Sequence, residues 1–427
     1  MNTDIIVGLD IGTTKIACLV GRLTENNKIE ILGIGRSESV GVQRGVVTNI
    51  EQTINSIRTA VQQAERESGV DIKVVNVGIA GQHIRSVQQR GMYMCNRVED
   101  EITRDDVKQL ISDMHKVLLL PGERIIHALP QEFSVDGENG IKNPVGMSGV
   151  RMEANFHVIT GQVTAIGNIF KCVERAGLQV KELMLEPLAS SAAVLSDEEK
   201  EAGVALVDIG GGTTDVAIFQ DGIIRHTAVI PFGGNIITED IRHGCTIMKN
   251  EAEALKTQYG SALSSEAESA IICIKGLRGR ATREISTKVL AEIIQARMSE
   301  ILELVHYEIK NSGYEKKLIG GIVLTGGGSQ LKHMKQLVEY TTGLDCRIGY
   351  PNEHVSKAPS EKMLIPALAT GVGLVISGAE VMEPVATPVT QAQGEIEKEE
   401  APVQDPRNPR GILNILRDFF ETKDEEA

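Results

Sequence analysis

A glycine-rich segment between two apolar runs is the part of the sequence best suited to binding a charged ligand. Residues 204–219 read VALVDIGGGTTDVAIF, so one apolar run ends in Asp208 and another follows Asp215. Short β-branched runs around a glycine-rich break predict a β-hairpin. Glycine lets backbone N–H groups approach an anion, and a carboxylate beside a phosphate requires a divalent cation between them. The segment indicates either a site for a metal-bound phosphate or an ordinary tight turn.

A second segment of the same kind lies near the N-terminus. Residues 5–20 read IIVGLDIGTTKIACLV, with Asp10 in the place of Asp208. This repetition favours the phosphate site over a chance turn, and it predicts two duplicated domains that each present one turn. We align Lys15, a positive point charge suited to phosphate, with Asp215 of the second segment.

The composition is that of a globular protein with two or more domains. The 427 residues are 41% hydrophobic and 24% charged, with a net charge of −14. This acidity argues against a general polyanion-binding protein, and the absence of Trp argues against stacking platforms for nucleic acid. Six scattered cysteines without a CxxC fit a reducing cytoplasm, and the N-terminus does not resemble a signal peptide.

The order of the predicted elements indicates an α/β domain interrupted by a small module. A strand at 28–36, a helix capped by Asn49 and ended by Gly69, and a buried strand at 72–79 complete the first domain. Residues 85–162 then contain a helix and two strands around a glycine-rich loop, which we interpret as an inserted α+β subdomain without evident chemistry.

A third glycine-rich turn follows a strand in the second half of the chain. Residues 318–331 read LIGGIVLTGGGSQL, and we expect Ser329 to begin a helix after the three glycines. Such a turn presents N–H groups and the positive end of a helix to a ligand, although it is not the GxGxxG fingerprint. Together with the two hairpins, it suggests one nucleotide in a cleft between two domains.

Other charged residues allow a functional and a structural interpretation. Glu186, at a helix start, could hold an attacking water or complement the helix dipole. Glu253 and Lys256 share a helix face and could reach a ribose or base, or form an exposed ion pair. The basic stretch 277–297 is either a dock for an acidic peptide or a solvated face.

The C-terminal region changes character twice. Residues 380–409 are rich in Pro and Glu and poor in large apolar residues, which predicts a disordered linker. Residues 410–424 predict an amphipathic membrane-targeting helix, and a helix that docks on a partner or on its own domain is the alternative. The apolar stripe of this helix consists of Ile412, Leu413, Ile415, Leu416, Phe419 and Phe420. One such helix binds reversibly, whereas many copies on a polymer bind firmly.

These motifs, with ALATG at 367–371, resemble the actin, Hsp70 and sugar-kinase ATPase superfamily. The segments 129–160, 186–195 and 204–222 are similar to the bacterial cell-division family FtsA, as are the linker and the terminal helix. The resemblance implies two duplicated actin-like ATPase domains that flank a nucleotide cleft, with an inserted small α+β subdomain. The implied parts are domain 1A at 1–84 and 163–197, subdomain 1C at 85–162, domain 2A at 198–230 and 301–379, and helical subdomain 2B at 231–300.

The resemblance also implies ATP with Mg²⁺ in the cleft. The implied nucleotide-binding residues are Asp10, Gly12, Thr13, Thr14, Lys15, Asp208, Gly210, Gly211, Gly212, Thr213, Thr214, Gly234, Glu253, Lys256, Gly326, Gly327, Gly328 and Ser329. Asp10 and Asp208 would lie near the metal, and Glu186 matches a water-positioning carboxylate of related filament proteins. Hydrolysis is at most slow.

The family further implies a protein at the division site, on the cytoplasmic face of the inner membrane. It would form filaments, bind the C-terminal peptide of the tubulin-like FtsZ through Arg283 and Arg297, and contact other division proteins but no nucleic acid. A sugar or acid kinase and a cell-shape or pilus-assembly protein are the alternatives. A kinase requires an acceptor pocket and has no use for a tethered tail.

Overall fold

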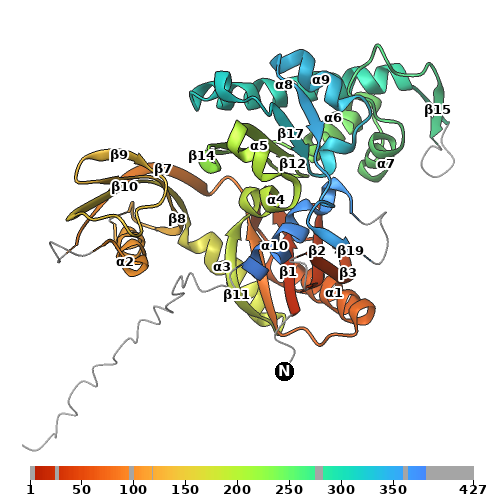
Figure 1. The fold of residues 1–427 in the computed structure, drawn as a ribbon. Coiled ribbons are helices and arrows are strands. Elements are labelled where there is room, and N and C mark those ends of the chain that lie inside the picture. The colour runs from red at the N-terminus through yellow and green to blue at the C-terminus, as the bar shows by residue number, and fades with distance from the viewer. Residues whose placement is uncertain are drawn as a thin grey trace, which may run out of the picture. The chain divides into compact units, whose positions relative to one another are not determined.

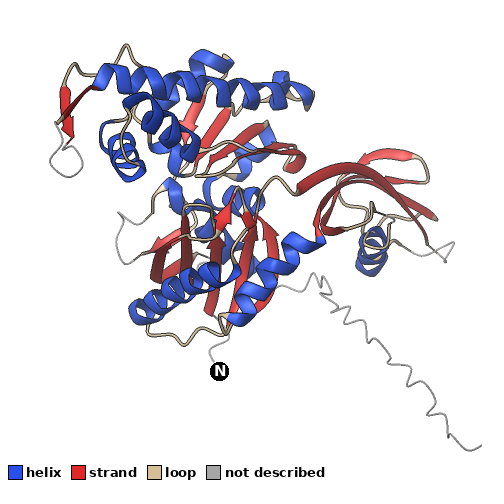
Figure 2. Cartoon of the chain, turned by 180° about the vertical axis from the view of Figure 1, so that it is seen from behind, coloured by secondary structure: helices blue, strands red, loops and turns tan. Residues whose placement is uncertain are grey.

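The computed structural model describes residues 5–24, 28–95, 101–117, 119–274, 282–358 and 364–380. The terminal helix predicted at 410–424, and the linker predicted at 380–409 except for its first residue, lie outside the described residues. In the described part of the chain, helices and strands alternate, as the sequence predicts for an α/β fold (Figure 1, Figure 2).

A six-stranded sheet with the order β11-β6-β1-β2-β3-β19 forms what we call the first lobe. The strands β1, β2 and β3 are an antiparallel meander, and β6 and β11 continue from β1 in parallel. The strands are β1 (Ile5–Ile11), β2 (Lys15–Leu23), β3 (Ile29–Glu38), β6 (Val74–Ile79), β11 (Gln179–Leu185) and β19 (Val355–Lys357), with a small pair β4 (Val42–Gln43) and β5 (Val46–Val47) nearby. The helices are α1 (Ile50–Ser68), α3 (Val163–Arg175), α4 (Glu186–Val194) and α10 (Ala369–Glu380), which follows the 3-10 turn η5 (Pro366–Leu368).

A five-stranded sheet with the order β14-β13-β12-β17-β18 forms the second lobe and repeats this arrangement. Its strands are β12 (Val204–Ile209), β13 (Thr214–Gln220), β14 (Ile223–Ile230), β17 (Ile322–Thr325) and β18 (Cys346–Ile348). Again an antiparallel meander is extended by two parallel strands. The helices are α5 (Asp197–Ala202), α6 (Gly234–Cys245), α7 (Lys249–Tyr259), α8 (Thr287–Asn311) and α9 (Met334–Thr342), with the 3-10 turns η2 (Glu315–Lys317) and η3 (Gly327–Gln330). The duplication predicted from the two glycine-rich hairpins is therefore confirmed.

Alternate side chains of the central strands pack on opposite faces of each sheet. In β1, Val7 and Leu9 belong to a core with α1 and α3, whereas Ile6 belongs to a core with α4 and α10. In β12, Val207 packs with the outer helices, and Leu206 joins the core that contains α4 and α10. These two helices thus share one apolar core with both sheets.

The inserted subdomain is a four-stranded antiparallel sheet with one helix. Its order is β7-β10-β8-β9. The elements are β7 (Ile84–Met94), α2 (Arg104–Met114), β8 (Glu123–Val135), β9 (Glu138–Ile141) and β10 (Arg151–Gln162). Thr103 and Asp106 cap each other at the start of α2, and Leu110, Met114 and Phe156 fill the core beneath it.

Polar side chains of the inserted subdomain contact β14, the edge strand of the second lobe. Gln131 Nε2 donates to the Ile224 carbonyl at 2.8 Å, and Ser86 Oγ donates to the Thr227 carbonyl at 3.1 Å. His157 Nε2 lies 2.9 Å from Thr227 Oγ1, and burial lowers the pKa of His157 to about 4. These contacts satisfy carbonyl groups that an edge strand otherwise leaves unpaired.

The region predicted to be helical at 231–300 differs from the prediction. It contains α6 and α7, but also the two-stranded hairpin β15 (Ile271–Ile274) and β16 (Arg283–Ser286). The β-branched sequence of β15 favours a strand, which the basic character of the region obscured. The helix α8 continues through the boundary that we predicted between residues 300 and 301.

The close crossing of α4 and α10 generates a test of the fold. A Cβ on Gly373 would overlap the Ala189 carbonyl oxygen. We expect Gly373→Ala to lower the free energy of unfolding by about 1–3 kcal/mol because the helices must separate. Urea denaturation measures this change. Gly167→Ala, in α3, has open space around its Cβ and should be neutral or stabilising by up to about 1 kcal/mol. Equal effects of the two substitutions would contradict this description of the crossing.

Candidate functional site

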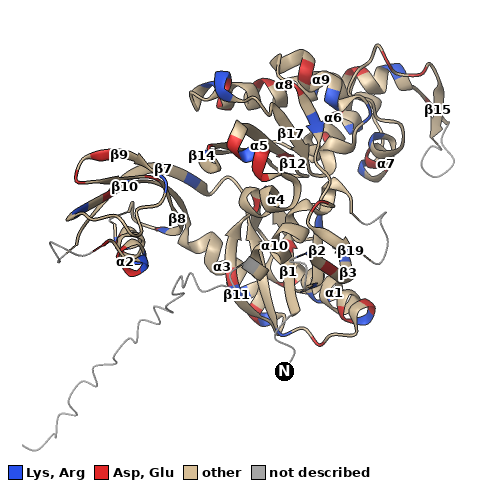
Figure 3. Cartoon of the chain, in the orientation of Figure 1, with Lys and Arg blue, Asp and Glu red and all other residues tan. Residues whose placement is uncertain are grey.

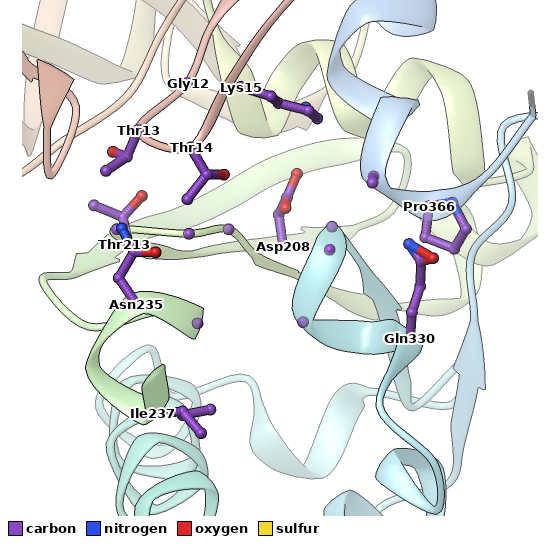
Figure 4. A pocket seen from close by; sticks show the side chains of 18 of the residues that line it. Gly12, Thr13, Thr14, Lys15, Asp208, Thr213, Asn235, Ile237, Gln330 and Pro366 are labelled. Carbon is purple, nitrogen blue, oxygen red and sulfur yellow. The ribbon is translucent and has the colours of Figure 1, made fainter. Parts of the chain in front are cut away.

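A cavity of about 510 Å³ lies where the glycine-rich turns of the two lobes meet (Figure 4). The first lobe contributes the β1–β2 turn and the start of α4. The second lobe contributes the β12–β13 turn, the starts of α6 and η3, and part of α7. Its size suits a nucleotide, because small-molecule sites commonly enclose several hundred cubic ångströms.

The two hairpin turns touch each other beside the cavity. A Cβ on Gly211 would overlap the side chain of Thr14, and one on Gly212 would overlap the side chain of Thr13. Figure 4 shows Thr13 and Thr14 opposite Thr213. Only glycine allows this approach, so the residues that the sequence singled out for phosphate binding also bring the lobes together.

The strand register corrects our alignment of the two turns. Ile11 pairs with Ile16, and Ile209 pairs with Thr214, so four residues separate the paired positions in each hairpin. Lys15 therefore corresponds to Thr213 rather than to Asp215. Asp215 instead lies directly opposite Asp208 on the neighbouring strand.

Four of the five carboxyl groups that line the cavity, those of Asp10, Asp208, Asp215 and Glu186, interact electrostatically with one another and with Lys15. Lys15 Nζ lies 2.9 Å from Asp10 Oδ2. Burial opposes the charge of Lys15, but Asp10 raises the lysine pKa overall. Burial raises the pKa of Asp208 to about 6, and burial together with Asp208 raises the pKa of Asp215 to about 8. Burial, then the charges of Asp10, Asp215 and Asp208, raise the pKa of Glu186 well above its usual value. In this group of five side chains, the carboxyl groups therefore outnumber the single lysine.

The donor set fits a Mg²⁺ ion that arrives with phosphate rather than a metal held by the protein alone. Among the described residues, no group of three or more His, Cys, Asp or Glu side chains is arranged to hold a metal. Asp215 is 5% exposed, and its Oδ1 has no hydrogen-bond partner. Mg²⁺ is commonly held by one or two carboxylates, several waters and substrate phosphates. Asp10, Asp208 and Asp215 are the carboxylates placed for this.

The helices of the second lobe supply another side of the cavity. Lys256 Nζ donates to the Gly234 carbonyl at 2.9 Å and to Thr238 Oγ1 at 2.8 Å, and it pairs with Glu253 at 2.7 Å. Lys256 is 9% exposed, whereas the side chain of Glu253 is 46% exposed, so the pair is half-buried rather than the fully exposed ion pair of our alternative interpretation. Both residues also line the cavity. The backbone N–H of Gly234 donates to the Gly210 carbonyl, which fixes the β12–β13 turn against α6.

Two of the predicted nucleotide contacts do not line the cavity. Thr214 Oγ1 donates to the Phe232 carbonyl at 2.9 Å, and Ser329 Oγ donates to the Gly326 carbonyl at 2.8 Å. Both side chains are buried, so these hydroxyls hold the turns rather than face a ligand. Ser329 also lies inside η3, and the α-helix that we expected there begins only at Met334.

The structure brings together most of the predicted site. The lining includes Asp10, Gly12, Thr13, Thr14, Lys15, Glu186, Asp208, Gly210, Gly211, Gly212, Thr213, Gly234, Glu253, Lys256, Gly326, Gly327 and Gly328. The sequence did not single out several further lining residues, among them Gly45, Ala80, Asn235, Ile237, Thr257, Gln258, Gln330, Leu331, Lys332 and Pro366. The glycine pair before Asn235 was an available signal, since it resembles the other turns. Thr370 lies in the ALATG motif, which we did not assign to the site.

The predicted partner-binding residues lie outside this cavity. Arg283 Nη1 donates to the Cys245 carbonyl at 3.0 Å. Arg297, on α8, pairs with Asp240 at 2.6 Å and also with Glu300. Basic and acidic residues are interspersed in this region (Figure 3). Arg283 is therefore the less constrained of the two arginines. The six apolar residues predicted to bind a membrane, Ile412 to Phe420, lie outside the described residues.

The contact between the turns predicts a defect in Gly211→Val. The new side chain would collide with Thr14 and force the turns apart, so we expect nucleotide affinity to fall about tenfold or more. Isothermal titration calorimetry with ATP and MgCl₂ measures the change. Gly167→Val, at an open position of α3, is the matched control, and equal affinities in the two variants would disprove this role of the contact.

The raised pKa of Asp215 predicts a pH-dependent stability. The folded state binds this proton more tightly than the unfolded state, so stability is lost as pH rises from about 4 to about 8. In the nucleotide-free protein, the free energy of unfolding should fall between pH 5 and pH 8.5, and Asp215→Asn should make this fall smaller by about 1–3 kcal/mol. Urea unfolding across this range tests it, with the exposed Asp71→Asn as control. Parallel pH profiles of Asp215→Asn and the unsubstituted protein would count against the burial of a proton at this site.

Comparison with known proteins gives the family. A model described as "Cell division protein FtsA" matches residues 205–373, and one for the "SHS2 domain inserted in FTSA" matches residues 81–160. The chain is 42% identical to the cell division protein FtsA of Pseudomonas aeruginosa over 376 residues, which cover 88% of this chain and 89% of that protein. It is 38% identical to that of Neisseria meningitidis over 416 residues, 97% of both chains.

Solved structures show the same fold at low sequence identity. A PilM-PilN type IV pilus biogenesis complex matches with a TM-score of 0.64 and 15% identity, over 88% of this chain and 98% of that chain. MreB5 of Spiroplasma citri, bound to ADP, matches with a TM-score of 0.53 and 16% identity, over 89% and 96%. The actin-like fold with its inserted subdomain is thus confirmed, and the chain belongs to the FtsA family of bacterial cell-division proteins.

Proposed function

We propose that this protein binds ATP with Mg²⁺, assembles into filaments on the cytoplasmic face of the inner membrane, and tethers the FtsZ ring there. The observation that carries the nucleotide part is the meeting of two glycine–threonine turns at one cavity. The family relationship supports the role in division. The MreB5 structures, which carry ADP and AMPPNP, support a nucleotide in a cavity of this fold.

In this proposal, the two turns hold the phosphates from opposite sides. Backbone N–H groups at Gly12 and Gly211 and the hydroxyl of Thr13 donate to phosphate oxygens, and Lys15 adds a positive charge. Mg²⁺ would neutralise phosphate charge beside Asp10 and Asp208, where carboxylates alone would repel it.

Glu186 is the residue that we propose for activating water. It lines the cavity at the first position of α4, and its pKa is raised by burial and by neighbouring carboxylates. A carboxylate whose pKa is raised is a stronger base than an ordinary carboxylate once its proton has left, and a cation beside it would favour that loss. We propose a slow ATPase, with binding and assembly as the main function.

The membrane part rests on the sequence. The apolar stripe between Ile412 and Phe420 is the proposed anchor. Among the described helices, none is both long and apolar enough to span a bilayer. An interfacial helix attaches a protein reversibly, so filament formation would supply the multiple anchors needed for firm attachment.

Deletion of residues 411–427 tests the tether. The truncated protein should remain in the supernatant when sedimented with lipid vesicles, while its affinity for ATP with MgCl₂ stays unchanged. The full chain should sediment with the vesicles. Co-sedimentation of the truncated protein would disprove the anchor, and absence of ATP binding in both proteins would disprove the nucleotide proposal.

Substitution of Arg283 tests the FtsZ contact. Arg283→Glu reverses the charge offered to an acidic peptide, so we expect at least about fivefold weaker binding of an FtsZ C-terminal peptide by fluorescence anisotropy. Arg297→Gln is the companion variant, because glutamate there would face Asp240 and Glu300 and risk the fold. Unchanged peptide binding in both folded variants would place the contact elsewhere.

A further inference from the structure

Two buried hydroxyl groups contact the carboxylate of Asp208. Ser190 Oγ donates to Asp208 Oδ2 at 2.9 Å, and Thr370 Oγ1 lies 3.0 Å from Ser190 Oγ. Thr370 Oγ1 is also 3.5 Å from the same carboxylate oxygen. Ser190 has no exposed surface, and Thr370 is 7% exposed. Because the serine proton is given to the carboxylate, the threonine proton is shared between Ser190 Oγ at 3.0 Å and Asp208 Oδ2 at 3.5 Å, and the shorter contact joins Thr370 to Ser190.

The two hydroxyls come from the helices that share a core with both sheets. Ser190 lies one turn after Glu186 on α4, so both side chains project from the same face of that helix. Thr370 lies in the first turn of α10. The two helices cross where Gly373 leaves no room for a side chain against Ala189. This close crossing holds the hydroxyls at a fixed separation.

Asp208 itself belongs to the other lobe, at the end of β12. Its Oδ1 lies against Gly326, where a Cβ would overlap it, and its Oδ2 accepts the bond from Ser190. The carboxylate is thus bounded on one side by the third glycine turn and on the other by the helices of the first lobe. Its direction toward the cavity is set by both lobes at once.

We propose that Ser190, oriented by Thr370, is a positioning residue that fixes the Asp208 carboxylate for the cation that accompanies the nucleotide phosphates. This inference rests on the proposed function of the cavity. The same bonds join α4 to β12, so the carboxylate is correctly directed only when the lobes are closed on each other. A purely structural role would affect nucleotide binding equally with and without the cation, and this difference makes the proposal testable.

The test compares ADP affinity of the full-length protein in MgCl₂ and in EDTA, by calorimetry. The readout is the factor by which magnesium strengthens binding. In Ser190→Ala, we expect this factor to fall about tenfold, because that ratio of affinities corresponds to the loss of one hydrogen bond to a charged group. The affinity measured in EDTA should change much less. Thr370→Val keeps the shape but removes the hydroxyl, and it should lower the same factor. Thr370→Ser restores the hydroxyl and should restore the factor.

Three results would overturn the inference. The magnesium factor could be unchanged in folded Ser190→Ala, or affinity could fall equally in MgCl₂ and EDTA, which would mean that the hydroxyl only stabilises the fold. If Ser190→Ala does not fold, the Thr370→Val and Thr370→Ser pair decides, and equal factors in that pair would reject the proposal. Absence of ADP binding by the unsubstituted protein in both conditions is a distinct outcome, because it rejects the proposed function and the inference together.

Discussion

The excess of negative charge between the two lobes is the constraint on which the rest of the site depends. Asp10, Asp208, Asp215 and Glu186 line one cavity, and Lys15 forms an ion pair with Asp10. Such a group of carboxylates is costly to bury unless protons or cations neutralise it. In the nucleotide-free protein, this cost raises the pKa values of Glu186, Asp208 and Asp215. A ligand that brings Mg²⁺ offsets the same charge, so the site favours a nucleotide with its cation over a bare phosphate.

The fold places this charge by duplication. Each lobe contains an antiparallel meander that parallel strands extend. The turn of the first hairpin has four residues in each lobe. The helices α4 and α10 share an apolar core with both sheets. They carry Glu186 and Thr370 to the cavity, and they place Ser190 against the Asp208 carboxylate. Packing and chemistry therefore depend on the same two helices. The inserted subdomain adds a separate contact at β14, whose polar bonds connect it to the lobe that holds Asp208.

The repeated pattern of an apolar run, an aspartate, glycines and threonines was sufficient to predict the hairpins, the duplication and the turn residues that line the cavity. The roles of Thr214 and Ser329 could not be predicted, because a hydroxyl beside a glycine turn can face a ligand or cap a carbonyl, and only the backbone path decides. The alignment of Lys15 with Asp215 was wrong because the number of residues in a turn, rather than the order of residue types, sets the register. Gly45 and Ala80 come from segments without any local signal and reach the cavity only through tertiary packing. The β15–β16 hairpin was missed because a short β-branched strand beside basic residues has no clear periodicity.

The position of a bound nucleotide tests the central claim most directly. A crystal structure of the protein grown with ATP and MgCl₂ should show the phosphates in the cavity that residues 12–15 and residues 210–213 line, with a cation near Asp208. Electron density for the nucleotide anywhere else, or a cavity that holds no phosphate under saturating ATP, would contradict the account.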